Sequence, residues 1–284
     1  MEVLHRIDAV RRCVAGWRGA GHSVGLVPTM GSLHEGHLSL VELARRQADR
    51  VVASLFVNPL QFGAGEDFDR YPRDLARDGR LLDEAGVALM FAPEVTEIYP
   101  DGAGSTTVVE VPALAGVLEG QFRPGHFTGV ATVVVKLLNI VQPDLAVFGE
   151  KDFQQLAVIR RLARDLCLPV RIHGGPIIRD TDGLALSSRN AYLAPRERSI
   201  APLLYRQLQD TARRVAGGDR DWGKLEADAL RELGRAGFAP DYFSVRRPDD
   251  LREPRDSDRH LVILAAARIG STRLIDNLRL RLND

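Results

Sequence analysis

Short apolar segments alternate with amphipathic helical segments through the first two-thirds of this 284-residue chain. Five segments rich in Val, Leu and Phe predict buried strands, at residues 24–27, 51–57, 87–92, 145–148 and 170–173. Helical periodicity lies between them, at residues 38–49, 74–85, 128–141 and 153–165. Apolar runs without strict alternation are typical of parallel strands that are covered on both faces. The order therefore predicts a doubly wound, Rossmann-like α/β sheet, in which ligands bind where strand ends lead into helix starts.

The pattern changes in the last third of the chain. Residues 193–216 predict one long helix with Pro195 in its first turn, and residues 225–236 predict a second helix. Three short strands are predicted beside them, at residues 242–245, 261–267 and 272–277. We therefore expect a Rossmann-like domain at residues 1–176 and a smaller α+β domain at residues 177–284 that acts as a lid.

The charge balance and the cysteine content limit the possible binding partners and the cellular compartment of the protein. Lys and Arg number 38, as do Asp and Glu, so that no basic excess favours a nucleic acid or an anionic membrane as partner. No apolar run is long enough to span a bilayer, and the charged N-terminal segment contains no signal core. Cys13 and Cys167 have no metal-binding spacing. We expect two reduced thiols, with Cys167 buried, in a cytoplasmic protein.

The segment from Val27 to His37 places two histidines three residues apart, between a predicted strand and a predicted helix. This spacing puts His34 and His37 on one face of the first helical turn. Free backbone N–H groups at a helix N-terminus bind phosphate, and two imidazoles beside them can stabilise charge that develops on an α-phosphorus. The motif therefore predicts ATP chemistry. Two ordinary helix-start histidines are the alternative, whereas the zinc motif His-Glu-x-x-His requires a spacing of four.

Further polar groups follow the second predicted strand. Asn58 and Gln61 are neutral groups suited to a small substrate with hydroxyls and a carboxylate, although a polar turn at Pro59 is an equally good interpretation. The acidic residues 66–71 are interpreted either as a solvated face or as a metal-associated lid.

Lys151 opens the helix after the fourth predicted strand and can bind phosphate, with Gln155 on the same helix face. Asp152 can cap this helix, contact Mg²⁺ through water or, like Glu150, interact with the helix dipole. At the domain junction, two serines and Arg189 form either a mobile phosphate clamp or an N-cap with a surface arginine. Because no P-loop is present, the separate phosphate motifs favour attack at the α-phosphorus with pyrophosphate as leaving group.

Together these residues resemble the pantoate–β-alanine ligase family. The resemblance runs through residues 27–37, 56–73, 123–152 and 154–193, in the order and spacing of the family. The string Arg-Pro-Gly-His-Phe-Thr-Gly-Val-Ala-Thr at residues 123–132 is its most specific part.

The resemblance implies that the carboxylate of pantoate attacks the α-phosphorus of Mg-ATP, and that β-alanine then attacks pantoyl adenylate to give pantothenate and AMP. It implies His37 as principal catalytic residue, with His34, Lys151 and Arg189 assisting. Gln61 and Gln155 would bind pantoate, with Asn58 assigned to the same site, and Gln61 would also meet β-alanine. The implied ATP site consists of Met30, Gly31, Ser32, Leu33, His34, Glu35, Gly36, His37, Gly149, Glu150, Lys151, Asp152, Ile178, Leu186, Ser187, Ser188 and Arg189.

The family is usually a homodimer, and the resemblance implies no organic prosthetic group and leaves the Mg²⁺ ligands unassigned. Two other functions are weighed against it. A nucleotidyl transferase acting on a phosphate ester would need a cationic acceptor pocket, whereas the predicted acceptor groups are neutral amides. A nucleotide sensor without catalysis would not need His37, Lys151 and Arg189 together.

Overall fold

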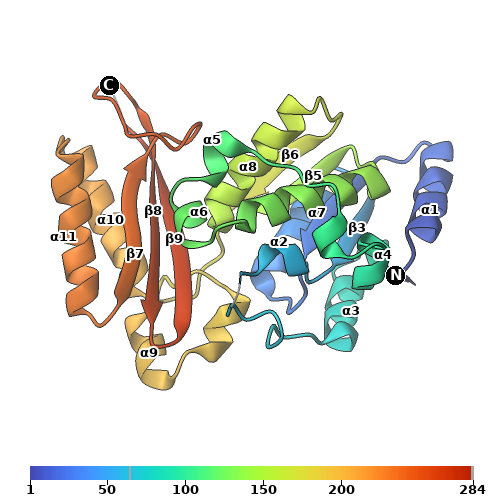
Figure 1. Ribbon diagram of the computed structural model, residues 1–284, viewed down its shortest axis with the longest axis horizontal. Coiled ribbons are helices and arrows are strands. Elements are labelled where there is room, and N and C mark those ends of the chain that lie inside the picture. Colours follow the sequence, from blue (N-terminus) through green and yellow to red (C-terminus); the bar gives the residue numbers. More distant parts are fainter. Residues whose placement is uncertain (64, 283–284) are drawn as a thin grey trace.

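The computed structural model describes residues 1–63 and 65–282. Figure 1 shows two sheets side by side, each with its own helices. The larger sheet is parallel and has the strand order β1-β4-β3-β2-β5-β6. Its strands are β1 (Glu2–Leu4), β2 (Val24–Thr29), β3 (Arg50–Leu55), β4 (Leu89–Phe91), β5 (Leu145–Gly149) and β6 (Arg171–Gly175). The predicted doubly wound sheet is confirmed, and β1 is an additional edge strand that its three-residue sequence was too short to indicate.

Helices cover both faces of this sheet because its inner strands β2, β3, β4 and β5 are buried on both sides. In β2, Leu26 packs with α1 (Ile7–Gly19), α7 (His126–Val141) and α8 (Phe153–Asp165) in one buried cluster. Its neighbour Val27 points the other way, into a cluster with α2 (Glu35–Arg45) and α3 (Leu75–Glu84). Three short helices link β4 to α7, namely α4 (Val95–Ile98), α5 (Pro112–Ala115) and α6 (Glu119–Phe122).

The second sheet is antiparallel, with β8 between β7 and β9. Its strands are β7 (Ala239–Arg246), β8 (His260–Ile269) and β9 (Thr272–Arg281). On one face of β8, Leu261, Ile263 and Ala265 pack against α10 (Leu203–Ala216) and α11 (Trp222–Arg235). On the other face, Val262 and Leu264 belong to the core of the first domain. The small sheet therefore lies between its own helices and the first domain (Figure 1).

Two predictions, one in each domain, are wrong. The single helix expected at 193–216 is two helices, α9 (Pro195–Ile200) and α10, because Pro202 has no N–H to donate and interrupts the helical hydrogen bonds. Cys167 is exposed rather than buried, since it lies just after α8 in a left-handed conformation with φ of 53°. Both cysteines are free thiols. Among the described residues no helix has the length and apolar character of a membrane span.

One contact between α7 and the loop after β3 is unusually close. A Cβ atom added at Gly129 would lie 2.0 Å from the carbonyl oxygen of Leu60. The carbonyl oxygen of Gly129 in turn accepts a hydrogen bond of 3.0 Å from the Asn58 amide. Only glycine permits this approach, and the contact positions the loop that carries Gln61.

We expect the substitution Gly129→Ala to destabilise the protein by about 2–4 kcal/mol, because the methyl group must displace the backbone at Leu60. Urea denaturation measures the effect. The matched control is Gly16→Ala in α1, where nothing lies within 4 Å of the added Cβ and the change should stabilise by up to about 1 kcal/mol. Equal stability of the two variants would contradict the close contact.

Candidate active site

A cavity of about 210 Å³ opens where β2 and β5 end and their following helices begin. The structure places most of the predicted site residues in its wall. They are Met30, His34, Gly36, His37, Gln61, Gly149, Lys151, Asp152, Gln155, Ile178, Leu186, Ser187, Ser188 and Arg189. Six others that were predicted do not line it: Gly31, Ser32, Leu33, Glu35, Asn58 and Glu150.

The two histidines cap α2 with their own rings. His34 is the N-cap residue and its Nδ1 accepts from the Gly36 N–H at 3.1 Å, while Nδ1 of His37 accepts from the His34 N–H at 3.3 Å. The ring centroids are 4.1 Å apart. Because both Nδ1 atoms accept, each neutral ring carries its proton on Nε2. The expectation that these backbone N–H groups are free is therefore wrong, and the helix start instead presents two imidazole N–H donors.

Burial keeps both imidazoles neutral. Desolvation, followed by the positive charge of Lys151, lowers the pKa of His34 to about 4. Desolvation, and then His34 and Lys151, lower the pKa of His37 to about 3. In the ligand-free protein at pH 7, the pair therefore acts as hydrogen-bond donors without positive charge.

A buried carboxylate shapes the loop before these histidines. The carboxylate of Asp78, in α3, accepts from the backbone N–H of Ser32 at 2.7 Å and from that of Leu33 at 2.9 Å. Asp78 is only 1% exposed. Ser32 has a φ of 52°, in the left-handed region that residues other than glycine rarely adopt. The backbone donors of Ser32 and Leu33 are thus occupied by Asp78, and neither residue lies in the cavity wall.

The side chain of Gln61 is oriented by a hydrogen bond from Asn58, which lies outside the cavity wall. Its Oε1 accepts a hydrogen bond of 3.0 Å from the amide of Asn58, so that its own NH₂ group is left for the cavity. Asn58 is fully buried, and its Oδ1 accepts from the Tyr99 hydroxyl at 2.8 Å. Asn58, which was assigned to the pantoate site, therefore orients Gln61 rather than facing the cavity.

The backbone of Gln61 is held as well. Its carbonyl oxygen accepts from Nδ1 of His126 at 2.8 Å and from Nη2 of Arg123 at 3.1 Å. With its proton on Nδ1, His126 can accept at Nε2 from Nη1 of Arg123 at 3.1 Å. Desolvation and the adjacent Arg123 lower the pKa of His126 to about 4, so that the ring is neutral at pH 7.

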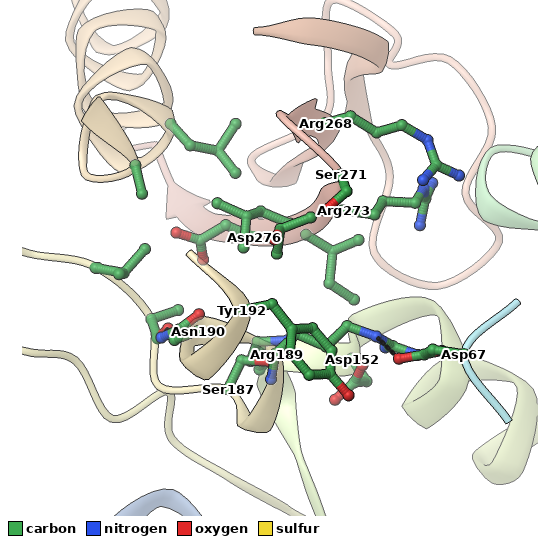
Figure 2. A pocket seen from close by; sticks show the side chains of 18 of the residues that line it. Asp67, Asp152, Ser187, Arg189, Asn190, Tyr192, Arg268, Ser271, Arg273 and Asp276 are labelled. Atoms are coloured by element: carbon green, nitrogen blue, oxygen red, sulfur yellow. Dashed lines mark hydrogen bonds and ion pairs between the residues drawn. The ribbon is translucent and has the colours of Figure 1, made fainter. Parts of the chain in front are cut away.

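The phosphate-binding candidates meet at the domain junction. Asn277 of β9 donates to the carbonyl oxygens of Glu150 and Lys151, both at 2.9 Å, and so fixes the turn that carries Lys151. Arg189 forms a bidentate ion pair with Asp67, at 3.0 and 2.9 Å (Figure 2). The acidic segment was interpreted either as a solvated face or as a metal-associated lid. Asp67 fits neither fully, because it is ion-paired and its side chain is only 15% exposed.

Sequence reasoning did not assign a role to Asp67, Asp78, Tyr99, Arg123 or His126. Arg123 and His126 belong to the string that carried the family resemblance, which was a usable signal. Asp67 lies in the acidic segment whose partner was unknown. For Asp78 and Tyr99 no local pattern exists, because their partners lie 46 and 41 residues away in sequence.

The family model described as pantoate-beta-alanine ligase matches residues 2–279. The chain belongs to this family. It is 56% identical to the pantothenate synthetase of Pseudomonas putida strain GB-1, over 100% of this chain and 99% of the relative. It is also 56% identical to the pantothenate synthetase of Pseudomonas aeruginosa strain UCBPP-PA14, over the full length of both.

Solved structures of other family members have the same fold. Pantothenate synthetase from Thermus thermophilus matches with a TM-score of 0.90 at 48% identity, covering 98% of this ligase and 99% of that chain. Pantoate-beta-alanine ligase from Francisella tularensis, solved in complex with beta-gamma ATP and beta-alanine, matches with a TM-score of 0.83 at 33% identity, covering 98% and 97%.

The activity of this ligase follows from its family. It condenses (R)-pantoate with β-alanine in an ATP-dependent reaction that passes through pantoyl adenylate and releases pyrophosphate and AMP, and the product is pantothenate. This assignment decides for the ligase over the two alternatives weighed from the sequence, a nucleotidyl transferase acting on a phosphate ester and a nucleotide sensor.

We expect His126 to position Gln61. If Gln61 contacts pantoate, as the resemblance implies, His126→Gln should raise the KM for pantoate about tenfold, because the donor to the Gln61 carbonyl is lost. His126→Asn keeps an N–H near the place of Nδ1 and should raise it less than about threefold. The KM for ATP should change less than about twofold in both. Equal increases for both substrates in both variants would indicate a purely structural ring.

The neutral state of His37 also predicts acid sensitivity. Its pKa is about 3 in the folded protein and 6.5 in the unfolded reference, so the unfolded chain alone takes up the proton between these values. Stability is fully present above pH 6.5 and falls as the pH drops towards 4. We expect wild type to lose about 1–2 kcal/mol more than His37→Gln between pH 7 and 4.5 in urea denaturation, a figure that allows for partial exposure of the ring. If wild type and His37→Gln lost the same free energy of unfolding between pH 7 and 4.5, His37 would not be neutral in the folded protein.

Proposed function

We propose that His37 and His34 donate hydrogen bonds from Nε2 to the α-phosphate of ATP as pyrophosphate leaves. The observation that carries this role is the pair of rings whose Nδ1 atoms are already occupied by backbone N–H groups. Only Nε2–H is then left for the cavity, which both rings line. Donors already oriented towards developing charge lower the barrier without reorganising during the reaction.

Lys151, Ser187, Ser188 and Arg189 are proposed to bind the β- and γ-phosphates. The last three come from the second domain, so that the domain at residues 177–284 contributes to nucleotide binding and can close over the site. The division after residue 176 is supported by the end of β6 at Gly175. Arg189 must exchange Asp67 for phosphate oxygens when ATP binds, since one guanidinium fork cannot hold both in the same geometry.

Gln61 and Gln155 are proposed to bind the hydroxyls and the carboxylate of pantoate. Both line the cavity, and neutral amides bind such groups without a strong ion pair that would weaken the nucleophile. Gln61 is also proposed to meet β-alanine, the ligand of the Francisella tularensis relative. Its NH₂ group is directed by Asn58, which therefore contributes indirectly.

Mg²⁺ is proposed to enter with ATP rather than to occupy a protein cage. Within residues 1–63 and 65–282 no group of three or more His, Cys, Asp or Glu side chains is placed to hold a metal ion. Asp152 is the carboxylate in the wall of the substrate cavity and can contact a phosphate-bound Mg²⁺ directly or through water. We also propose that the protein is cytoplasmic, which its two free thiols support, and that it is a homodimer, which the family resemblance supports.

The role of His37 is tested by His37→Ala. Turnover should fall about 10²–10⁴-fold, because a donor to the transition state is lost. Pantoate-dependent exchange between ATP and pyrophosphate, measured without β-alanine, should fall in parallel since it reports adenylate formation alone. Thermal denaturation at pH 7.5 is the control for folding. Near wild-type exchange would exclude His37 from the first half-reaction.

A further inference from the structure

A second and larger cavity, of about 350 Å³, lies between the two domains. It adjoins the substrate cavity, because Lys151, Asp152, Ser187 and Arg189 line both. Neither His34 nor His37 reaches it. Its opposite wall is built by the end of β8 and the start of β9, where Arg268, Ser271 and Arg273 lie across from Arg189 and Tyr192 (Figure 2). The cavity therefore begins where the proposed phosphate clamp ends.

Ion pairs account for most of the charge in this wall. Four of its carboxylates are bound by arginines: Glu66 by Arg123 at 2.6 Å, Glu119 by Arg273 at 2.5 Å, Asp67 by Arg189 at 2.9 Å, and Asp276 by Arg179 at 2.6 Å. In the described part of the chain, three lining cations have no carboxylate partner, namely Arg70, Lys151 and Arg268. Among the described lining residues, Asp152 is the one carboxylate without an arginine partner. Six lining cations stand against five lining carboxylates, so the wall has an excess of one positive charge, and its unpaired cations Arg70, Lys151 and Arg268 can meet a compact polyanion.

We propose that this cavity, called here the exit chamber, binds inorganic pyrophosphate as its magnesium complex and releases it from the side remote from the histidines. The carboxylate oxygen of pantoate forms a bond to the α-phosphorus, and the bond from that phosphorus to the bridging oxygen breaks. The electron pair of the broken bond leaves with pyrophosphate, which moves past Lys151 and Arg189 towards Arg268 and Arg70. No proton or further reactant is needed for this displacement.

A separate exit has a chemical reason. Pantoyl adenylate is a mixed anhydride that water hydrolyses, so the first product should leave while the histidine side of the site stays closed. The Asp67–Arg189 pair stands in the wall of the exit chamber, and Asp67 can retake the Arg189 guanidinium once phosphate oxygens have left it. When the Asp67–Arg189 ion pair forms again, Arg189 no longer binds pyrophosphate, so pyrophosphate leaves rather than moving back to the substrate cavity. The inference rests on the proposed ATP site, since it takes Lys151 and Arg189 as the point of transfer.

The test uses Arg268→Gln, Arg70→Gln and the double variant. Neither arginine lines the substrate cavity, and both are exposed, so folding and ATP binding should be preserved. Product inhibition by pyrophosphate should weaken about threefold to fivefold in each single variant and more in the double variant, because each loses one solvent-screened contact with a polyanion. The KM for ATP should stay within about twofold. Arg206→Gln is the matched control, an exposed arginine of α10 that lines neither cavity.

Three outcomes overturn the inference. Unchanged inhibition by pyrophosphate in the double variant would show that the exit chamber does not bind it. If the KM for ATP rose by the same factor by which inhibition by pyrophosphate weakened, Arg268 would belong to the ATP site instead. If Arg206→Gln weakened inhibition by pyrophosphate as much as Arg268→Gln did, the effect would come from the net charge of the protein alone. Lys151→Gln tests the underlying site separately: if its exchange activity equals that of wild type, the proposed phosphate clamp is wrong regardless of the result at Arg268.

Discussion

The carboxylate of Asp78 holds the loop on which the active site depends. Two backbone N–H groups, those of Ser32 and Leu33, converge on it, and burial strengthens both hydrogen bonds. These contacts stabilise the left-handed backbone at Ser32, which turns the chain from β2 into α2. The turn sets the place of His34 and His37, so that a side chain of α3 determines where these two rings lie in the cavity wall.

Polar groups that never touch the cavity orient those that do. Asn58 and His126 hold the side chain and the backbone of Gln61, and Asn277 holds the turn of Lys151 from the other domain. Each bond fixes the direction of a donor before substrate arrives, which is the condition for electrostatic stabilisation without reorganisation. The neutral donors His34, His37, Gln61 and Gln155 line the substrate cavity alone, whereas Lys151 and Arg189 line both cavities.

Much of the fold was predictable because its strands and helices have strong local signals. Strand β2 and helix α8 were expected close to their observed places, since apolar runs and periodicity agree there. Helix α2 was expected at residues 38–49, and it begins earlier, at Glu35, because His34 caps it. The break at Pro202 was missed although its cause is local, because an amphipathic pattern continues across it. Cys167 was expected to be buried on residue type alone, whereas its exposure depends on where α8 ends.

The sequence by itself determined the alternation of the inner strands with helices, the spacing of His34 and His37, and the set of residues that marks the ligase family. These features depend on residues that are close together in the sequence, so local sequence patterns are enough to recognise them. Only the tertiary structure decided that both histidines are neutral, that Asn58 supports Gln61 from outside the cavity, and that Arg189 is paired with Asp67, 122 residues away. Burial and ion pairing depend on which segments meet in space, and no local pattern encodes that meeting.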